Sequence, residues 1–352
     1  MKTINRIDLL NNLTLVKSGL SAREFIEQSS CFVFEDGWVM TFNDEIACRK
    51  RIEGLNITGA VQAAAFMDII AKLTDDELEI VDGGKGELVF QGKRKRFGLV
   101  MEEKVFLPIS RVEKPEKWRP IPPEFTQAIG LVSHCVSTDQ SRFVLTCIHI
   151  HPDFVEACDN HQLMRCKVET GVKESILVRG TSLEPLLQLG MEKMAETDSW
   201  LHFKNAEGLI YSCRRYIEDY PMLDQLFRVK GNTITLPKGK GLVDATDRAA
   251  VFALEKVGSA LLTVQLKPGM IQIAGQGLSG WYKERRALAY TGPELEFLIA
   301  PHLLRHISDK YEEAVVSETK MKAKGGAWQY ITVLGSPKDT EAEEPADEDA
   351  EE

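Results

Sequence analysis

The chain has 352 residues, of which 43% are hydrophobic and 27% are charged, and its formal net charge is −10. This length exceeds what one hydrophobic core usually supports, so several domains are expected. No apolar run approaches a membrane span and the N-terminus lacks the apolar core of a signal peptide, which excludes a membrane or secreted class and indicates a cytoplasmic protein.

The negative charge is concentrated in the last residues. Residues 337–352 contain nine acids and one base, a net of −8, which leaves about −2 for the rest. Many like charges without an aromatic residue are typical of a disordered tail, so net charge does not exclude nucleic-acid binding by the remainder. The seven cysteines, an odd number, favour reduced thiols.

The first elements in chain order are a helix and a hairpin. Apolar residues at helical spacing predict a helix near residues 9–16, and Asp36-Gly37 separates two apolar runs as a hairpin turn does. A strand at 55–58 is expected to lead into a helix over 61–73, followed by strand, turn and strand over 77–90.

A similar order of strands and a helix is predicted in the middle of the chain. Two runs, 143–149 and 154–157, flank the turn Pro152-Asp153. Thr181 can cap a helix over 181–194, with Pro185 in its first turn and an apolar stripe. The stripe consists of Leu183, Leu186, Leu187, Met191 and Met194. Strands resume at 200–203 and 209–213.

A third copy follows, with a strand at 295–299 leading into a helix over 301–311. The landmarks of the three copies are Ile70, Leu187 and Ile307 in the second helices and Leu9, Phe125 and Leu242 in the first helices. Their spacings are 117 and 120 residues for the first set and 116 and 117 for the second. A repeat of this length indicates three similar domains, over 1–115, 116–233 and 234–336, with an acidic tail at 337–352. Pro108 to Pro123 is the expected linker between the first two.

Several segments resemble one known family, the bacterial DNA polymerase III beta subunit, or sliding clamp. Ala157-Cys-Asp-Asn-His-Gln-Leu163 resembles the family's Ala-Thr-Asp-Gly-His-Arg-Leu, and Asp219-Tyr-Pro221 resembles its Phe-Pro-Asp-Tyr turn. Residues 247–256 look like the segment that opens its third domain. The family's Met-Pro-Met-Arg ending is replaced here by residues 330–336 and the acidic tail. A divergent clamp, for example one encoded by a phage, would show this combination.

The resemblance implies an α+β fold of three clamp-type domains, each with two helices packed on antiparallel sheets, which forms a ring on dimerisation. It implies a non-catalytic processivity factor without a cofactor, which encircles double-stranded DNA irrespective of sequence. The expected protein partners are a DNA polymerase and a clamp loader, bound through short peptide motifs. Val251 and Phe252 resemble homodimer interface positions, although Phe252 would also be explained by packing within its own domain.

A ring around DNA requires basic residues on the outward faces of its helices. The candidates are Lys17, Arg23, Lys72, Lys193, Arg248, Arg305 and Lys310, of which Arg23 resembles a DNA-contacting position of the family. The alternative is ordinary solvated surface. The clusters at 93–96 and 283–286 fall on predicted strands or turns and are expected to face away from DNA.

The resemblance also implies a pocket for partner peptides between the second and third domains. Its lining, carried over by motif, is Cys158, Leu163, Pro221, Leu226, Ile331 and Val333. Apolar burial would supply the affinity. The alternative for Leu163, Ile331 and Val333 is a place in the ordinary core.

Enzyme classes find little support in the sequence. His149 and His151 share one side of a predicted strand near Cys158, His161 and Cys166, but the spacing matches no familiar zinc pattern. The glycine-rich turns lack the pattern of a nucleotide-binding loop, and no nucleophile elbow is present. The remaining alternatives are a non-encircling scaffold that binds partner peptides and, more weakly, a hydrolase with a dispersed site.

Overall fold

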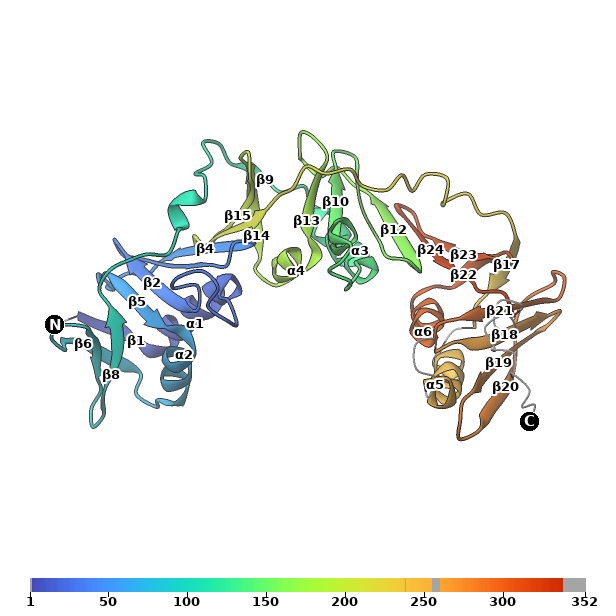
Figure 1. The fold of residues 1–352 in the computed structure, drawn as a ribbon, viewed down its shortest axis with the longest axis horizontal. Helices are drawn as coiled ribbons and strands as arrows, with labels where there is room; N and C mark the ends of the chain where they lie inside the picture. The colour runs from blue at the N-terminus through green and yellow to red at the C-terminus, as the bar shows by residue number, and fades with distance from the viewer. Residues whose placement is uncertain (1, 238, 255–259, 338–352) are drawn as a thin grey trace, which may run out of the picture. The chain divides into compact units, whose positions relative to one another are not determined.

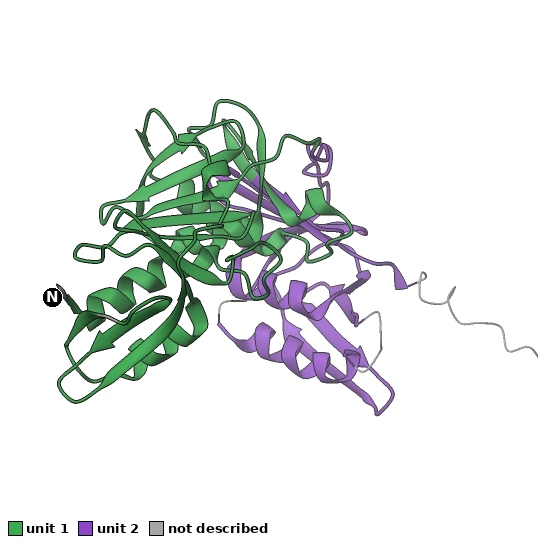
Figure 2. Cartoon of the chain, turned by 60° about the vertical axis from the view of Figure 1, so that its left-hand side comes forward, with its two compact units in different colours: residues 1–155, 168–219 green, residues 156–167, 220–352 purple. Residues whose placement is uncertain are grey.

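The computed structural model describes residues 2–237, 239–254 and 260–337. The predicted disordered tail therefore lies outside the described residues from 338 onward, as do Glu255 and Lys256. The chain divides into two compact units, which are described separately (Figure 2). Unit 1 comprises Met1–Val155 and Val168–Asp219, and unit 2 comprises Glu156–Lys167 and Tyr220–Glu352.

One order of elements occurs three times along the chain: strand, helix, four strands, helix, three strands (Figure 1). The first copy consists of β1 (Lys2–Asn5), α1 (Arg6–Val16), β2 (Cys31–Glu35), β3 (Trp38–Phe42), β4 (Ile46–Arg51), β5 (Gly59–Gln62), α2 (Ala63–Lys72), β6 (Glu77–Asp82), β7 (Glu87–Gln91) and β8 (Arg96–Glu102). The second consists of β9 (Arg119–Pro120), α3 (Phe125–Val132), β10 (Cys147–His151), β11 (Phe154–Cys158), β12 (Gln162–Lys167), β13 (Ile176–Arg179), α4 (Gly180–Leu183), β14 (Met191–Glu196), β15 (Trp200–Asn205) and β16 (Ile210–Arg214). The third consists of β17 (Asn232–Thr235), α5 (Gly241–Ala253), β18 (Leu262–Lys267), β19 (Met270–Gln276), β20 (Trp281–Ala287), β21 (Leu295–Ile299), α6 (Pro301–Lys310), β22 (Glu313–Val316), β23 (Lys320–Lys324) and β24 (Trp328–Val333).

Local sequence signals explain several of these elements. The Asn5 side chain accepts hydrogen bonds from the backbone N–H groups of Ile7 and Asp8, which caps α1. Asp36 and Gly37 both have positive φ, 51° and 77°, as a two-residue hairpin turn requires. The predicted first helix, this hairpin, the strand at 295–299 and the helix that follows it are confirmed.

The predicted helix over 181–194 is wrong. The α-helix α4 ends at Leu183, a 3₁₀-helix continues over Glu184–Leu187, and Gly190 at φ +58° precedes β14. The helix begins at Gly180 without a side-chain cap, so Thr181 does not cap it. Met191–Glu196 forms instead an antiparallel strand between β15 and β9, because tertiary pairing outweighs the helical spacing of its apolar residues.

Two further expectations need correction, and a third gains detail. Residues 55–58 carry no regular structure before β5, and Phe143–Thr146 is a 3₁₀-helix rather than part of a strand. The expected linker is partly ordered, because Ile109–Arg111 forms a 3₁₀-helix and Arg119–Pro120 pairs with β14.

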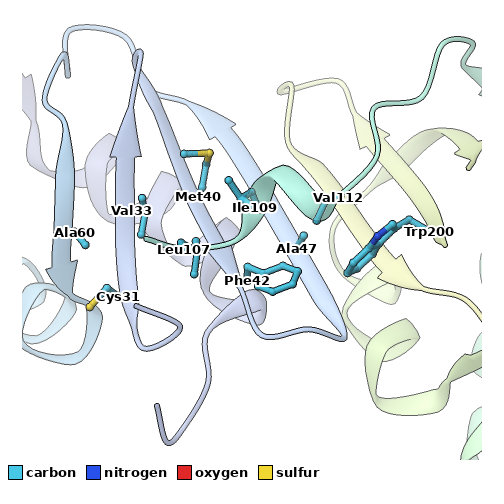
Figure 3. Close-up of a cluster of buried hydrophobic side chains, with 10 residues drawn as sticks. All are labelled: Cys31, Val33, Met40, Phe42, Ala47, Ala60, Leu107, Ile109, Val112 and Trp200. Carbon is cyan, nitrogen blue, oxygen red and sulfur yellow. The ribbon is translucent and has the colours of Figure 1, made fainter. Parts of the chain in front are cut away.

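Unit 1 contains a twelve-stranded sheet in the order β1-β6-β7-β8-β5-β2-β3-β4-β16-β15-β14-β9. Within it, β4 of the first copy pairs antiparallel with β16 of the second, which we call the first junction. A core cluster lies here, with Leu107 and the linker residues Ile109 and Val112 packed against the sheet near Trp200 (Figure 3).

Unit 2 repeats this connection with other residues. Strand β12 pairs antiparallel with β24, which we call the second junction, and the sheet continues through β23, β22 and β17. A four-stranded sheet has the order β20-β19-β18-β21, and helices α5 and α6 pack side by side. Among the described residues, no helix is long and apolar enough to cross a membrane.

Candidate functional site

The second junction aligns three of the residues predicted for a peptide pocket. Leu163 on β12 is directly opposite Ile331 on β24. The backbone N–H of Val333 donates to the carbonyl oxygen of His161 at 2.9 Å, which extends the pairing by one step. Leu163 and Ile331 are buried, whereas Val333 is 41% exposed. The junction therefore exposes the apolar side chain of Val333 next to the buried side chains of Leu163 and Ile331.

The segment of residues 220–231 begins with a tyrosine fixed to β11. The Tyr220 hydroxyl accepts a hydrogen bond from the backbone N–H of Cys158 at 2.9 Å and donates to its Sγ at 3.3 Å. Burial raises the pKa of both groups, so the tyrosine remains a neutral donor. Pro221 directly follows this anchor and is exposed.

Arg165 holds the middle of this segment. Its Nε donates to Glu156 Oε2 at 2.7 Å, and its Nη1 donates to Asp224 Oδ1 at 2.6 Å. Its guanidinium also lies 4.9 Å from the centroid of the Phe227 ring. Glu156 is 2% exposed, and Arg165 supplies this buried carboxylate with a charge partner.

The anchored segment leaves apolar side chains at the surface. Leu223 and Phe227 are buried, whereas Met222 is 89% and Leu226 37% exposed. With Pro221, these exposed side chains form an apolar rim that the segment's own core does not use.

A cavity of about 700 Å³ lies beside Val333. It is lined by His161, Asp247, Ala250, Leu254, Ala260, Leu261, Leu298, Ile299, Ala300, Pro301, His302, Leu303, Arg305, Val333, Leu334 and Gly335. Most of this lining is apolar, with a few polar groups, as in sites that bind apolar side chains.

The charged groups of the cavity are balanced or neutral. Arg305 Nε donates to Asp247 Oδ1 at 3.0 Å. Burial lowers the pKa of His302, an effect that Asp159 opposes and His161 reinforces, so His302 is neutral at pH 7. An apolar ligand would therefore meet little uncompensated charge.

The structure thus brings the predicted pocket residues into one region of unit 2. Leu163, Ile331 and Val333 occupy adjoining strands, Cys158 and Pro221 are linked through Tyr220, and Leu226 belongs to the anchored segment. The burial of Cys158, Leu163 and Ile331 agrees with the alternative that they are core, so Pro221, Leu226 and Val333 are the accessible members.

Sequence reasoning missed the cavity wall contributed by the third copy. Its apolar members include Leu254, Leu261, Leu298 and Pro301. The one signal available was Leu254, an apolar residue that follows α5 and is 66% exposed. The other members could not be separated from ordinary core residues by periodicity.

The basic residues predicted to face DNA differ in their surroundings. Lys17, Arg23 and Lys72 are exposed and form no salt bridge with another described residue. Arg248 pairs with Glu284 at 2.8 Å, Arg305 with Asp247 at 3.0 Å, and Lys310 with Asp309 at 3.0 Å. Lys193 is exposed but lies on strand β14, so its predicted place on a helix is wrong.

The ion pair of Arg248 belongs to a small network on α5 and β20. Partial burial acts to raise the pKa of Glu284, but hydrogen bonds from Tyr282, Arg248 and Arg286 outweigh it and lower the pKa to about 2. Glu284 is therefore ionised at neutral pH and holds Arg248 against β20.

The two predicted interface residues lie at the end of α5. Val251 is 62% exposed, and Phe252 is half-buried against Gly280, where an added Cβ would come within 3.2 Å of Phe252 Cε1. Packing within its own copy therefore accounts for the buried part of the Phe252 side chain.

The predicted histidine pair faces one side of β10, with ring centroids of His149 and His151 6.4 Å apart. The part of the chain that the structure describes contains no group of three or more residues suited to a metal ion. All seven cysteines are buried, and none of them forms a disulfide bond within the described residues.

No protein-family model and no curated protein matches the chain. Solved sliding clamps do match it in structure. The clamp of Pseudomonas aeruginosa bound to griselimycin has a TM-score of 0.81 at 17% identity, covering 95% of this chain and 99% of that one. The DNA polymerase III beta chain of Streptococcus pneumoniae gives 0.82 at 17%, covering 95% and 99%, and the Bacillus subtilis clamp gives 0.78 at 18%, covering 95% and 98%. The chain therefore has the α+β, three-domain fold of the sliding clamps, which confirms the resemblance at the level of the fold.

Proposed function

We propose that this protein is a DNA sliding clamp, a homodimeric ring that encircles duplex DNA and tethers a polymerase through short peptides. The observation that supports this best is the repeated strand junction. The chain joins its copies twice, through β4–β16 and β12–β24. The equivalent strands that remain are β20 of the third copy and β8 of the first. A second copy of the chain can supply the missing partner for each, head to tail.

Both of these strands offer an edge for pairing. β20 is the terminal strand of its four-stranded sheet. β8 pairs with β5 only at Met101 and Glu102, so Arg96–Val100 has no strand on that side among the described residues. Trp281 on β20 is 71% exposed and Val100 on β8 is 81% exposed. Exposed apolar edge strands are typical of an interface.

The two existing junctions also predict the register of the third. The hairpins that lead into β4, β12 and β20 are each closed by one backbone hydrogen bond, to the carbonyl oxygens of Ile46, Gln162 and Gly280. The next residue in β12, Leu163, lies opposite Ile331. The corresponding residue in β20 is Trp281.

On the partner strands, the hairpins before β24 and β8 are closed at the carbonyl oxygens of Trp328 and Lys95. Ile331 is three residues beyond Trp328, and Gly98 is three residues beyond Lys95. The predicted register therefore sets Trp281 of one copy opposite Gly98 of the other, where the large indole meets no opposing side chain.

The register is tested by cysteine pairing. The double variant Trp281→Cys with Gly98→Cys is expected to form a disulfide between two chains, because opposed residues in an antiparallel pair fall within disulfide reach. A Cβ at Gly98 meets Val89 at 3.4 Å, so the substitution is tolerated. The matched control, Trp281→Cys with Val100→Cys, is expected to cross-link poorly. Equal cross-linking of both variants would refute the register.

The ring itself is tested by mass and by DNA topology. Light scattering is expected to show a dimer near twice 39.5 kDa. Once loaded, the protein is expected to stay on a nicked circular duplex and slide off the linear form. A monomer that treats both DNA forms alike would favour the alternative, a non-encircling scaffold that binds partner peptides.

We assign DNA contact first to Lys17, Arg23 and Lys72, the candidates without a salt-bridge partner among described residues. The pair Lys17→Glu/Lys72→Glu is expected to weaken retention on circular DNA and flatten its salt dependence. Its charge-matched control is Lys85→Glu/Lys104→Glu, two exposed lysines in a turn and in the bend after β8. Equal weakening of retention by the control would show that DNA retention does not depend on the position of these lysines at the helices.

We assign partner peptides to the cavity at Val333 and the exposed rim at Leu226. An apolar peptide side chain would fill the cavity and gain roughly 25 cal/mol for each Å² buried. Val333→Asp and Leu226→Asp are each expected to weaken the binding of a fluorescent partner-type peptide about tenfold or more. Phe25→Asp, an exposed apolar residue of unit 1, is the control. Unchanged peptide affinity in both site variants would exclude the cavity.

A further inference from the structure

A second cavity in unit 2 differs from the first in its charge. It has a volume of about 500 Å³ and is bordered by the segment 228–232, the beginning of β21 and the turn before β23. Its cationic residues are Arg228, Lys230 and Lys320, and its acidic residue is Glu318. None of the three cations forms a salt bridge with another residue in the described ranges. We call this site the basic cavity.

The positive charge continues from the basic cavity along β23. Lys320, Lys322 and Lys324 alternate with buried Met321 and Ala323, so the three lysines share the outward face of the strand. Lys322 donates from its Nζ to the carbonyl oxygen of Phe227 at 2.7 Å, while Lys320 and Lys324 add positive charge on either side of it. Such like charges repel one another unless an anion lies nearby. The face is therefore suited to an extended polyanion.

The end of the described chain runs toward this cavity. Gly335 and Leu298 exchange both backbone hydrogen bonds of an antiparallel bridge, at 2.8 and 2.9 Å. In an antiparallel pair, each residue after Gly335 advances toward residues before Leu298. That direction leads to Leu295, which lines the basic cavity. Leu334 N–H also donates to the carbonyl of Thr319, another lining residue, at 2.8 Å.

The sequence beyond this point has the complementary charge. Residues 339–352 contain nine acids and no base. They are Asp339, Glu341, Glu343, Glu344, Asp347, Glu348, Asp349, Glu351 and Glu352. Fourteen residues can span roughly 45 Å, so the reach is ample.

We propose that residues 339–352 bind in cis to the basic cavity and the adjoining lysine face of β23. A nucleic acid is the other polyanion that fits, but a tethered segment competes at an effective concentration of about 1 mM and is directed to the site by the chain. The bound tail withdraws this sheet face from DNA. The inference stands independently of the proposed ring.

Zero-length carbodiimide cross-linking of the full chain tests the proposal. Lys230 and Lys320 are expected to form amide links to tail carboxylates, and the links are expected to weaken several-fold at about 0.5 M salt because screening shortens the range of these attractions. Arg228→Glu, which removes no amine, is expected to lower them several-fold. Arg94→Glu, an exposed arginine of unit 1, is the matched control and is expected to have no effect.

Three results would overturn the proposal. Links spread equally over Lys17, Lys72 and Lys85 would show that the tail has no preferred site. Links between chains of different isotopic label would place it on a second copy. Links unaffected by Arg228→Glu would exclude the basic cavity as the cause.

Competition with DNA gives a second measurement. If the tail binds the basic cavity with an intrinsic Kd of about 0.1 mM, its tethering would lower the apparent affinity of this site for a short oligonucleotide about tenfold. A chain ending at Pro337 is expected to bind the oligonucleotide tighter by this factor. Adding Arg228→Glu, Lys230→Glu and Lys320→Glu is expected to abolish the gain. A gain that persists in the triple variant would mean that the tail repels DNA from the whole surface, and equal affinity of the full and shortened chains would mean that it does not occupy the cavity.

Discussion

The two strand junctions within the chain have the same strand pairing and a similarly placed arginine, but their joining segments expose different side chains. In each, a segment that joins successive copies is held by an arginine three residues after the closing carbonyl of a hairpin. Arg49 donates to the carbonyl oxygen of Ile109 at 2.8 Å, and Arg165 bonds Asp224 and stacks on Phe227. Arginines at equivalent backbone positions therefore hold the two joining segments through different contacts.

The difference lies in what the two segments expose. At the first junction, the segment buries Leu107, Ile109 and Val112, and the cavity of about 860 Å³ beside it is lined partly by Glu35, Asp36 and Glu113. At the second junction, the segment exposes Pro221, Met222 and Leu226 beside a mostly apolar cavity. The first joining segment thus contributes three side chains to the core, whereas the second leaves three apolar side chains exposed.

The largest expected effect comes from the tryptophans of the two junctions. Trp200 is 1% exposed, with its ring 6.0 Å from Phe42 and 4.7 Å from the Arg214 guanidinium. Trp200→Ala is expected to lower the free energy of unfolding by about 4 kcal/mol in urea titrations. Trp328→Ala, at a half-buried residue of the second junction, is expected to lose about half as much. Equal losses would contradict the comparison.

The joining segments themselves are the next test. Ile109→Ala is expected to destabilise the protein by about 2 kcal/mol, since it opens a gap in the core cluster. Leu226→Ala is expected to cost below about 1 kcal/mol, because the side chain is already 37% exposed. Denaturant midpoints measure both. A large loss for Leu226→Ala would mean that this segment fills its own groove and leaves no room for a peptide.

Acid is expected to act on the first junction more than on the second. Burial lowers the pKa of His202 to about 4, while Glu113 acts to raise it and Arg49 to lower it further. Since the unfolded histidine titrates near pH 6.5, stability is complete above that pH and falls as the pH drops toward 4, by a loss of the order of 2 kcal/mol.

Unfolding experiments at pH 7 and pH 4.5 measure this loss. His202→Gln is expected to reduce the difference between the two pH values, whereas His302→Gln, at a more exposed histidine, is expected to change it less. An unchanged pH dependence in His202→Gln would assign the acid sensitivity to other groups.

The smallest expected effect concerns the two arginines. Arg165→Lys keeps a charge but cannot reproduce the bonds to both Glu156 and Asp224, so a loss of about 1 to 2 kcal/mol is expected. Arg49→Lys gives up only the bond to a carbonyl and is expected to lose about 1 kcal/mol or less. Proteolysis of segment 220–231 is expected to speed up only in Arg165→Lys. Faster cleavage in both variants would show that the anchors are equivalent.

Local chemistry accounts for the elements that the sequence predicted correctly. Asp36-Gly37 specifies a turn because it tolerates positive φ, and the helix of residues 301–310 follows from a proline in the first turn and a strong apolar stripe. The period of the three copies was visible because each copy must bury the same faces. These signals act within a few residues or repeat along the chain, so the sequence alone determined the repeated α+β fold.

Only the tertiary structure decided the features that depend on distant partners. Met191–Glu196 is a strand because β15 and β9 lie on either side of it, despite its helical spacing. The cavity beside Val333 needs α5, the residues just before β18, β21 and α6 to converge, and no local pattern encodes that convergence. The pairing of Arg305 with Asp247 likewise joins residues 58 positions apart. Burial and charge pairing are properties of three-dimensional neighbours, which is why the accessible members of the site became distinguishable from core only after folding.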